Sequence, residues 1–77
     1  MRVEVVVGLK NGVLDPQGKA IHHALHSLGY DKVSDVSVGK IITLEVEGNK
    51  EEVEKKVHEM CEVLLANTVI EDYKIKI

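Results

Sequence analysis

The sequence predicts an α+β fold built on a four-stranded antiparallel sheet. Four stretches alternate apolar and polar residues with the period of a strand, and two stretches between them carry apolar residues at helical spacing. The elements follow in the order strand, helix, strand, strand, helix, strand. Right-handed crossovers then favour the ferredoxin-like βαββαβ arrangement, with both helices on one face of the sheet and one domain over residues 1–77.

The first strand and the turn after it form the most distinctive stretch of the chain. Residues 2–9 alternate so that Val3, Val5, Val7 and Leu9 face the core. Asn11-Gly12 then marks a turn, because both residue types tolerate positive φ. Asp15 fits the N-cap of a helix and Pro16 its first position.

Gly18 falls in the first turn of that helix, where glycine costs roughly 1 kcal/mol relative to alanine. We therefore expect a close approach by another backbone there. The helix continues to about Leu28, with one apolar stripe at Ala20, Ile21, Ala24, Leu25 and Leu28, and Gly29 ends it in the left-handed region.

A second strand is expected over residues 33–38, followed by a tight hairpin turn near Gly39-Lys40 and a third strand over residues 41–47. Asn49 is the predicted N-cap of the second helix, which ends near Asn67. Residues 69–77 alternate as the closing strand. The sheet face away from the helices carries Val6, Ile41, Thr43 and Ile70 and would be too apolar for water, so we expect self-association through these side chains. Tyr73 of the closing strand is expected to support the fold and self-association as well.

Composition narrows the class of protein. A 77-residue chain has a small core, and its single cysteine offers no disulfide framework, so association is the natural source of added stability. The net charge of −3 disfavours nucleic acid as a partner. One cysteine and the absence of a signal-peptide pattern predict a cytoplasmic protein, and no apolar run approaches the roughly 18 residues that span a membrane.

No catalytic or metal site is predicted. Cys61 lies on the apolar stripe of the second helix, where cysteine behaves as a small hydrophobe. His22 and His26 lie one turn apart but lack further ligands, so they are read as surface residues. The loop after the first strand has neither an arginine for phosphate nor a CxxC pair for metal transport. Lys10 and Lys40 are expected at the ends of strands.

Three blocks of the sequence resemble one family. The blocks are Leu9-Lys10-Asn11-Gly12-Val13-Leu14-Asp15-Pro16-Gln17-Gly18, Val38-Gly39-Lys40, and Leu64-Leu65-Ala66-Asn67-Thr68-Val69-Ile70-Glu71-Asp72-Tyr73. They are similar to the signature blocks of PurS, the small subunit of phosphoribosylformylglycinamidine (FGAM) synthase. The similarity covers essentially the whole chain. Thr68 departs from it, since the family usually has proline after the asparagine, and we expect less rigidity there.

The resemblance implies a noncatalytic subunit of an ATP-dependent amidoligase complex in de novo purine biosynthesis. In that complex a glutaminase subunit releases ammonia from glutamine, and a large synthetase subunit uses ATP and Mg²⁺ to convert formylglycinamide ribonucleotide to the amidine. PurS-like subunits join these two and assist ammonia transfer, bind no cofactor themselves, and form dimers or dimers of dimers.

Partner contacts are then expected at the turn and at the second block: Lys10, Asp15, Pro16, Gln17, Gly18, Gly39 and Lys40. The alternative from another class is a regulatory module of ferredoxin-like fold that binds an amino acid or nucleotide at a dimer interface. Calorimetry with glutamine, ATP and purine nucleotides on the isolated protein separates the two readings.

Overall fold

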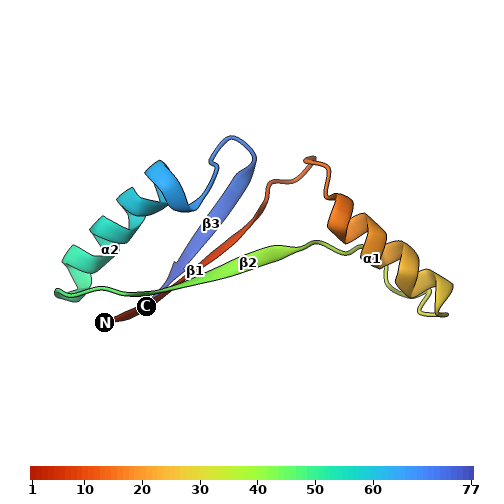
Figure 1. Ribbon diagram of the computed structural model, residues 1–77, viewed down its shortest axis with the longest axis horizontal. Coiled ribbons are helices and arrows are strands. Elements are labelled where there is room, and N and C mark those ends of the chain that lie inside the picture. The colour runs from red at the N-terminus through yellow and green to blue at the C-terminus, as the bar shows by residue number, and fades with distance from the viewer.

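The computed structural model describes residues 1–77 and contains a three-stranded antiparallel sheet with two helices (Figure 1). The strands lie in the order β2-β1-β3, so β1 is central and both other strands are edges. The elements are β1 (Arg2–Leu9), α1 (Pro16–Ser27), β2 (Gly39–Glu45), α2 (Lys50–Met60), a π-helical turn η1 (Cys61–Leu65) and β3 (Glu71–Lys76).

The core lies between the sheet and α2. Val3, Val5 and Val7 alternate along β1 and are at most 1% exposed, which confirms the prediction for these three residues. Leu9, also predicted to face the core, is only half-buried and lies outside it. Val53, Val57 and Cys61 lie at helical spacing and pack against them, all fully buried. Each of these six side chains is small, so the core of the single chain is thin.

The predicted four-stranded sheet is wrong, because residues 33–38 form no strand and Gly39 forms no turn. Gly39 is the first residue of β2 and pairs with Gly8, and the chain reaches β2 from residues 33–38 without reversing. A Cβ on Gly39 would lie 2.6 Å from the carbonyl oxygen of Val7. Glycine is therefore needed here for the close approach of two backbones and not for a hairpin.

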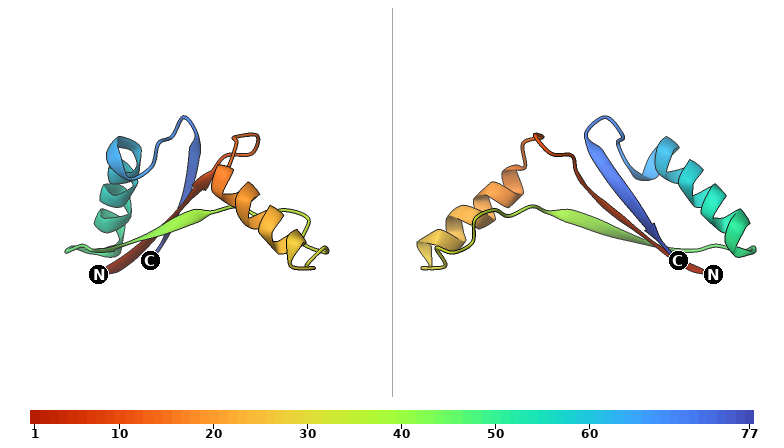
Figure 2. Two further views of the ribbon diagram at one scale, coloured as in Figure 1. Left: turned by 45° about the vertical axis from the view of Figure 1, so that its right-hand side comes forward. Right: turned by 180° about the vertical axis from the view of Figure 1, so that it is seen from behind.

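The prediction that both helices cover one face of the sheet is also wrong for the single chain. Residues 16–38, which we call the arm, contain α1 and the segment that returns beside it, and they extend beyond the sheet (Figures 1 and 2). The molecule measures 49 × 23 × 14 Å with a radius of gyration of 15.9 Å. A compact chain of this length has a radius of about 11.5 Å.

The local signals in the sequence are confirmed more closely than the topology. Asp15 caps α1 with Pro16 at the first position, and Asn49 caps α2 by accepting from the backbone N–H of Glu52 at 3.0 Å. Gly12 and Gly29 have φ of 84° and 98°, as the turn and the helix end require. The last strand begins at Glu71 and not at Val69, because residues 67–70 form a turn closed by the N–H of Ile70 donating to the carbonyl of Asn67.

No helix has the length and apolar character that crossing a membrane requires.

Candidate partner-docking site

Three segments of the chain meet where the arm joins the sheet, and we call this region the elbow. The carboxyl end of β1, the start of α1 and the start of β2 enclose a shallow pocket of about 390 Å³. Its polar rim is formed by Asp15, Gln17, Lys40 and Glu71. The full lining is Val7, Gly8, Leu9, Asp15, Pro16, Gln17, Val38, Gly39, Lys40 and Glu71.

Asp15 connects two of these segments with one carboxylate. Its Oδ1 accepts from the backbone N–H of Gly18 at 2.8 Å, and its Oδ2 accepts from the backbone N–H of Val38 at 2.9 Å. The hydrogen bond from Gly18 has the larger effect on the pKa of Asp15, and the one from Val38 adds to it. Both hold that pKa below its usual value because they stabilise the charged carboxylate. The N-cap is therefore also the link between the start of α1 and the segment that leads into β2.

Gly18 is the only buried residue of α1, and the structure explains why it is small. A Cβ at this position would lie 2.3 Å from the carbonyl oxygen of Val36. The close approach of another backbone that the sequence predicts is thus made by the chain's own return segment. The packing of Gly18 against Val36 is enough to require glycine at this position, whether or not a partner contacts it.

The structure brings most of the predicted partner-contact residues together. Five of them line the elbow pocket: Asp15, Pro16, Gln17, Gly39 and Lys40. Gly18 is not in the lining and packs against the backbone of Val36. Lys10 lies apart from them: its Nζ is 3.6 Å from Oδ1 of Asp72, and its backbone N–H donates to the carbonyl of Ile70 at 2.8 Å. Whether these residues contact a partner stays a prediction.

Sequence reasoning missed two contributors to this site. Val38 supplies the N–H that Asp15 accepts, and Glu71 adds a second carboxylate to the rim from the start of β3. Val38 belongs to the second block, directly before Gly39-Lys40, so the sequence pattern could have indicated that it lies at the elbow. The sequence carries no such signal for Glu71. It lies near the elbow because Leu9 of β1 pairs with Glu71 of β3.

The residues predicted for self-association do not share one face. Val6 and Ile41 lie opposite each other on the sheet face away from α2, with Thr43 along the same face, and Ile41 is 63% exposed. Ile70 lies in the turn before β3 and is 39% exposed. Tyr73 pairs with Val7 and points to the α2 side, where its hydroxyl donates to Oε2 of Glu62 at 2.6 Å.

Tyr73 belongs to a small polar cluster that ties β3 to the end of α2. Nδ1 of His58 lies 3.0 Å from the tyrosine hydroxyl, which also donates to Glu62. The hydrogen bond to Glu62, with burial and the charge of Glu62 adding to it, raises the pKa of Tyr73 to about 12. This cluster keeps the hydroxyl protonated and serves packing between the two elements.

The remaining chemical candidates are structural. Cys61 is fully buried, and burial, followed by the nearby charge of Glu62, raises the pKa of its thiol, which opposes the thiolate that nucleophilic chemistry needs. Nε2 of His22 and Nε2 of His26 lie 2.8 and 3.1 Å from the carbonyl oxygen of Val33, so the pair ties α1 to the return segment. No three histidine, cysteine or carboxylate side chains converge as a metal site.

The fold and the site define a small α+β chain with an open pocket where its arm joins a three-stranded sheet. The family model of PurS, phosphoribosylformylglycinamidine (FGAM) synthase, matches residues 2–77. The chain therefore belongs to the PurS family.

Curated relatives and solved structures agree with this assignment. The PurS subunit of Bacillus subtilis FGAM synthase is 53% identical over 99% of this chain and 90% of its own length, and a structure of B. subtilis PurS superposes with a TM-score of 0.87 over 97% of this chain and 94% of that one. Methanocaldococcus jannaschii PurS is 47% identical over 99% of this chain and 93% of its own. A chain of the PurLQS structure from Thermotoga maritima is 36% identical, with a TM-score of 0.89 over 97% of this chain and 93% of that one.

Proposed function

We propose that this chain, as a noncatalytic small subunit of FGAM synthase in purine biosynthesis, joins the glutaminase and synthetase subunits and assists the transfer of ammonia between them. The elbow is the observation that carries the proposal. Asp15 and Gly18 hold the start of α1 against the segment that leads into β2, and Gln17 and Lys40 line a shallow pocket beside them. A rigid, shallow surface of this kind suits a protein partner more than an enclosed small ligand.

The relatives support this division of labour. Curated relatives are named as PurS subunits of FGAM synthase, and the T. maritima structure is of PurLQS. In this proposal ATP, Mg²⁺ and glutamine are used by the partner subunits, and the buried thiol of Cys61 takes no part in glutamine hydrolysis. The proposed location is the cytoplasm, in keeping with a single reduced cysteine.

Lys40 provides the sharpest test of docking at the elbow, because reversing its charge changes the rim without touching the Asp15 contacts. Copurification of Lys40→Glu with the synthetase and glutaminase subunits, in the presence of glutamine and ADP, should fall at least tenfold. Lys56→Glu on α2 is the matched control, because Lys56 is exposed and lies away from the elbow pocket. A Lys40→Glu subunit that assembles a fully active complex would refute the assignment.

Gly18 is less suitable for that test, since any side chain there collides with Val36 and disturbs the arm itself. A second check is catalytic. The isolated chain should hydrolyse neither glutamine nor ATP, and turnover that Cys61→Ala abolishes would contradict a noncatalytic role.

We also propose that the chain self-associates. Only 8 of its 77 residues are buried, and large apolar side chains such as Leu28 (74% exposed) and Val63 (82% exposed) face water in the single chain. Exposed apolar surface of this extent is typical of an interface.

A further inference from the structure

The turn after β1 contains Asn11-Gly12, a pair of residues whose side chain and backbone can react with each other. The backbone nitrogen that follows an asparagine can attack the carbon of the asparagine side-chain amide. Glycine leaves that nitrogen unhindered, because it has no side chain. Asn11 and Gly12 are both exposed, so the pair is in contact with water.

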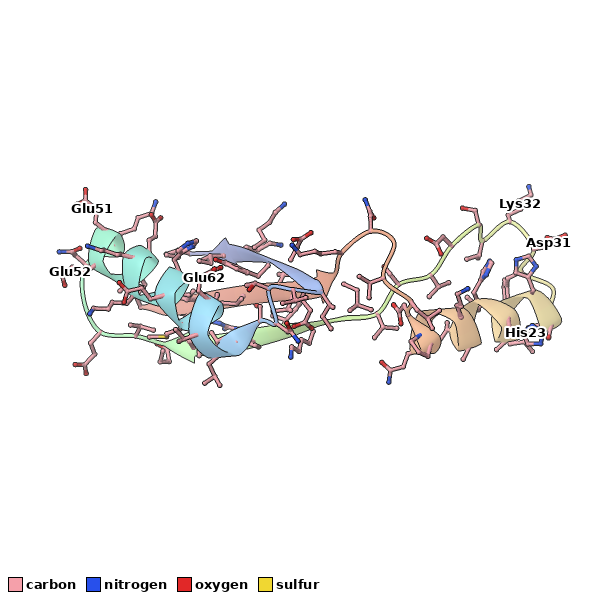
Figure 3. The ribbon with its side chains drawn as sticks, turned by 90° about the horizontal axis from the view of Figure 1, so that it is seen from above. His23, Asp31, Lys32, Glu51, Glu52 and Glu62 are labelled. Carbon is pink, nitrogen blue, oxygen red and sulfur yellow. The ribbon has the colours of Figure 1, made fainter.

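Nothing in the structure engages the two groups that would react. The side chain of Asn11 makes no hydrogen bond, and the N–H of Gly12 donates to no acceptor. One backbone hydrogen bond closes the turn, from the N–H of Val13 to the carbonyl of Lys10 at 3.2 Å. The apex of the turn stands clear of every other segment, as Figures 1 and 3 show. A turn closed by one long hydrogen bond opens readily, which gives access to the conformations that ring closure needs.

The other two asparagines of the chain have engaged side chains. Oδ1 of Asn49 accepts from the backbone N–H of Glu52 at 3.0 Å, as the N-cap of α2. Oδ1 of Asn67 accepts from the backbone N–H of Val69 at 3.2 Å. Each of these asparagines is followed by a residue with a bulky side chain. Asn11 alone combines an unbonded side chain with a following glycine.

We propose that Asn11 is a site of spontaneous deamidation in the folded protein. The nitrogen of Gly12 attacks the side-chain amide carbon of Asn11 and forms a new C–N bond. The amide nitrogen takes up the proton that the glycine nitrogen loses, and it leaves as ammonia. Water then opens the five-membered succinimide ring at either of its two carbonyls. The products are aspartate and isoaspartate, in which the main chain continues through the side-chain carboxyl group. Water is the only co-reactant.

Both products change the chain at the approach to the elbow. Each adds a carboxylate to a chain whose net charge is −3, and this carboxylate follows Lys10, whose Nζ lies 3.6 Å from Oδ1 of Asp72. The new charge can compete with Asp72 for that ammonium group. Isoaspartate also adds one carbon to the main chain between β1 and Asp15, which links α1 to the return segment. The reaction itself does not depend on the docking role proposed for the elbow.

Peptide mapping by mass spectrometry measures the reaction at each asparagine separately. The purified protein is kept at mildly alkaline pH, where the glycine nitrogen loses its proton more readily, and is sampled over time. The peptide that contains Asn11 should convert at least tenfold faster than those that contain Asn49 and Asn67. Part of the product should accept methyl groups from an isoaspartate methyltransferase. Equal rates at the three positions would overturn the inference.

The unfolded chain separates the effect of structure from the effect of sequence. All three asparagines are unrestrained in guanidinium chloride. Because the folded turn leaves Asn11 unrestrained as well, its folded rate should stay within tenfold of its unfolded rate. A folded rate more than tenfold lower would overturn the inference, since the turn or a second copy of the chain would then protect the site.

Asn11→Gln is the matched control, because the longer glutamine side chain has to close a less favourable six-membered ring. This variant keeps an uncharged amide at position 11. Its peptide should show at least tenfold slower conversion than the peptide of the unmodified sequence. Fresh Asn11→Asp protein provides the ion-exchange standard for the aspartate product. Conversion of Asn11→Gln at the original rate would show that the acidic species arises by another route, and it would contradict the proposal.

Discussion

Asp15 combines a general and a specific role. Any N-cap satisfies the first N–H groups of its helix, but this one also accepts from Val38, 23 residues away in sequence. A local signal in the sequence thus anchors a tertiary contact. Both contacts need a carboxylate with two accepting oxygens at position 15.

Asp15→Asn should destabilise the protein at neutral pH. The pKa of Asp15 is lowered in the folded state, so its contribution is complete above the unfolded value of about 3.9 and is lost as pH falls through the lower folded value. Denaturant unfolding of both proteins across this range should show a difference that shrinks as the solution becomes more acidic. A difference independent of pH would mean that the carboxylate charge plays no part.

Gly18→Ala should cost about 1–3 kcal/mol of stability, because its methyl group would lie 2.3 Å from the carbonyl oxygen of Val36. Gly8→Ala is the matched control: a Cβ there meets nothing within 4 Å, and its φ is not positive. Thermal or denaturant unfolding measures both variants. Equal stabilities would show that the return segment yields to the added methyl group.

At the scale of elements, the hydroxyl of Tyr73 on β3 contacts both α2 and the turn η1. Tyr73 connects the strand to His58 and Glu62, and β3 otherwise pairs only with β1. The end of α2 continues into the π-helical turn η1, which carries Glu62 toward the sheet. The hydroxyl therefore joins an edge strand to the layer above it.

The stability that Tyr73 contributes should disappear in strong alkali. Its folded pKa of about 12 lies above the unfolded value of about 10, so the contribution is complete below pH ~10 and is lost as pH rises through about 12. Tyr73→Phe should remove this pH dependence. In a Tyr30→Phe background, phenolate absorbance reports the titration of Tyr73 alone, and a midpoint near 10 would contradict the hydrogen bond to Glu62.

At the scale of the whole molecule, the chain is more extended than a compact domain of its length, with a radius of gyration of 15.9 Å. Its core contains seven hydrophobic residues, three on β1 and four between Val53 and Ala66, and α1 adds none of them. The TM-scores of 0.87 and 0.89 over 97% of the chain show that relatives keep the same overall shape. An amphipathic helix held away from its own core is expected to be stabilised by another chain.

The melting temperature should accordingly rise with protein concentration, because a folded dimer is favoured over two unfolded chains by mass action. Differential scanning calorimetry over a hundredfold range of concentration measures this. A melting temperature that does not change over that range would mean that the single chain is stable without a partner.

The sequence predicted the local structure and the family well. The limits of β1, the caps at Asp15 and Asn49, the end of α1 at Gly29 and the inward valines of β1 all depend on a few neighbouring residues, and all are confirmed. The elbow was predicted in part, because most of its residues lie in two short blocks.

Only the tertiary structure decided the topology. Residues 33–38 alternate like a strand, but alternation does not say which edge a strand pairs with, or whether that edge belongs to the same chain. Gly39 is equally ambiguous in sequence, since glycine serves both a turn and a close approach of backbones, and here the carbonyl of Val7 lies too near for any Cβ. The chain therefore runs straight through Gly39, and this one conformation directs α1 away from its own sheet.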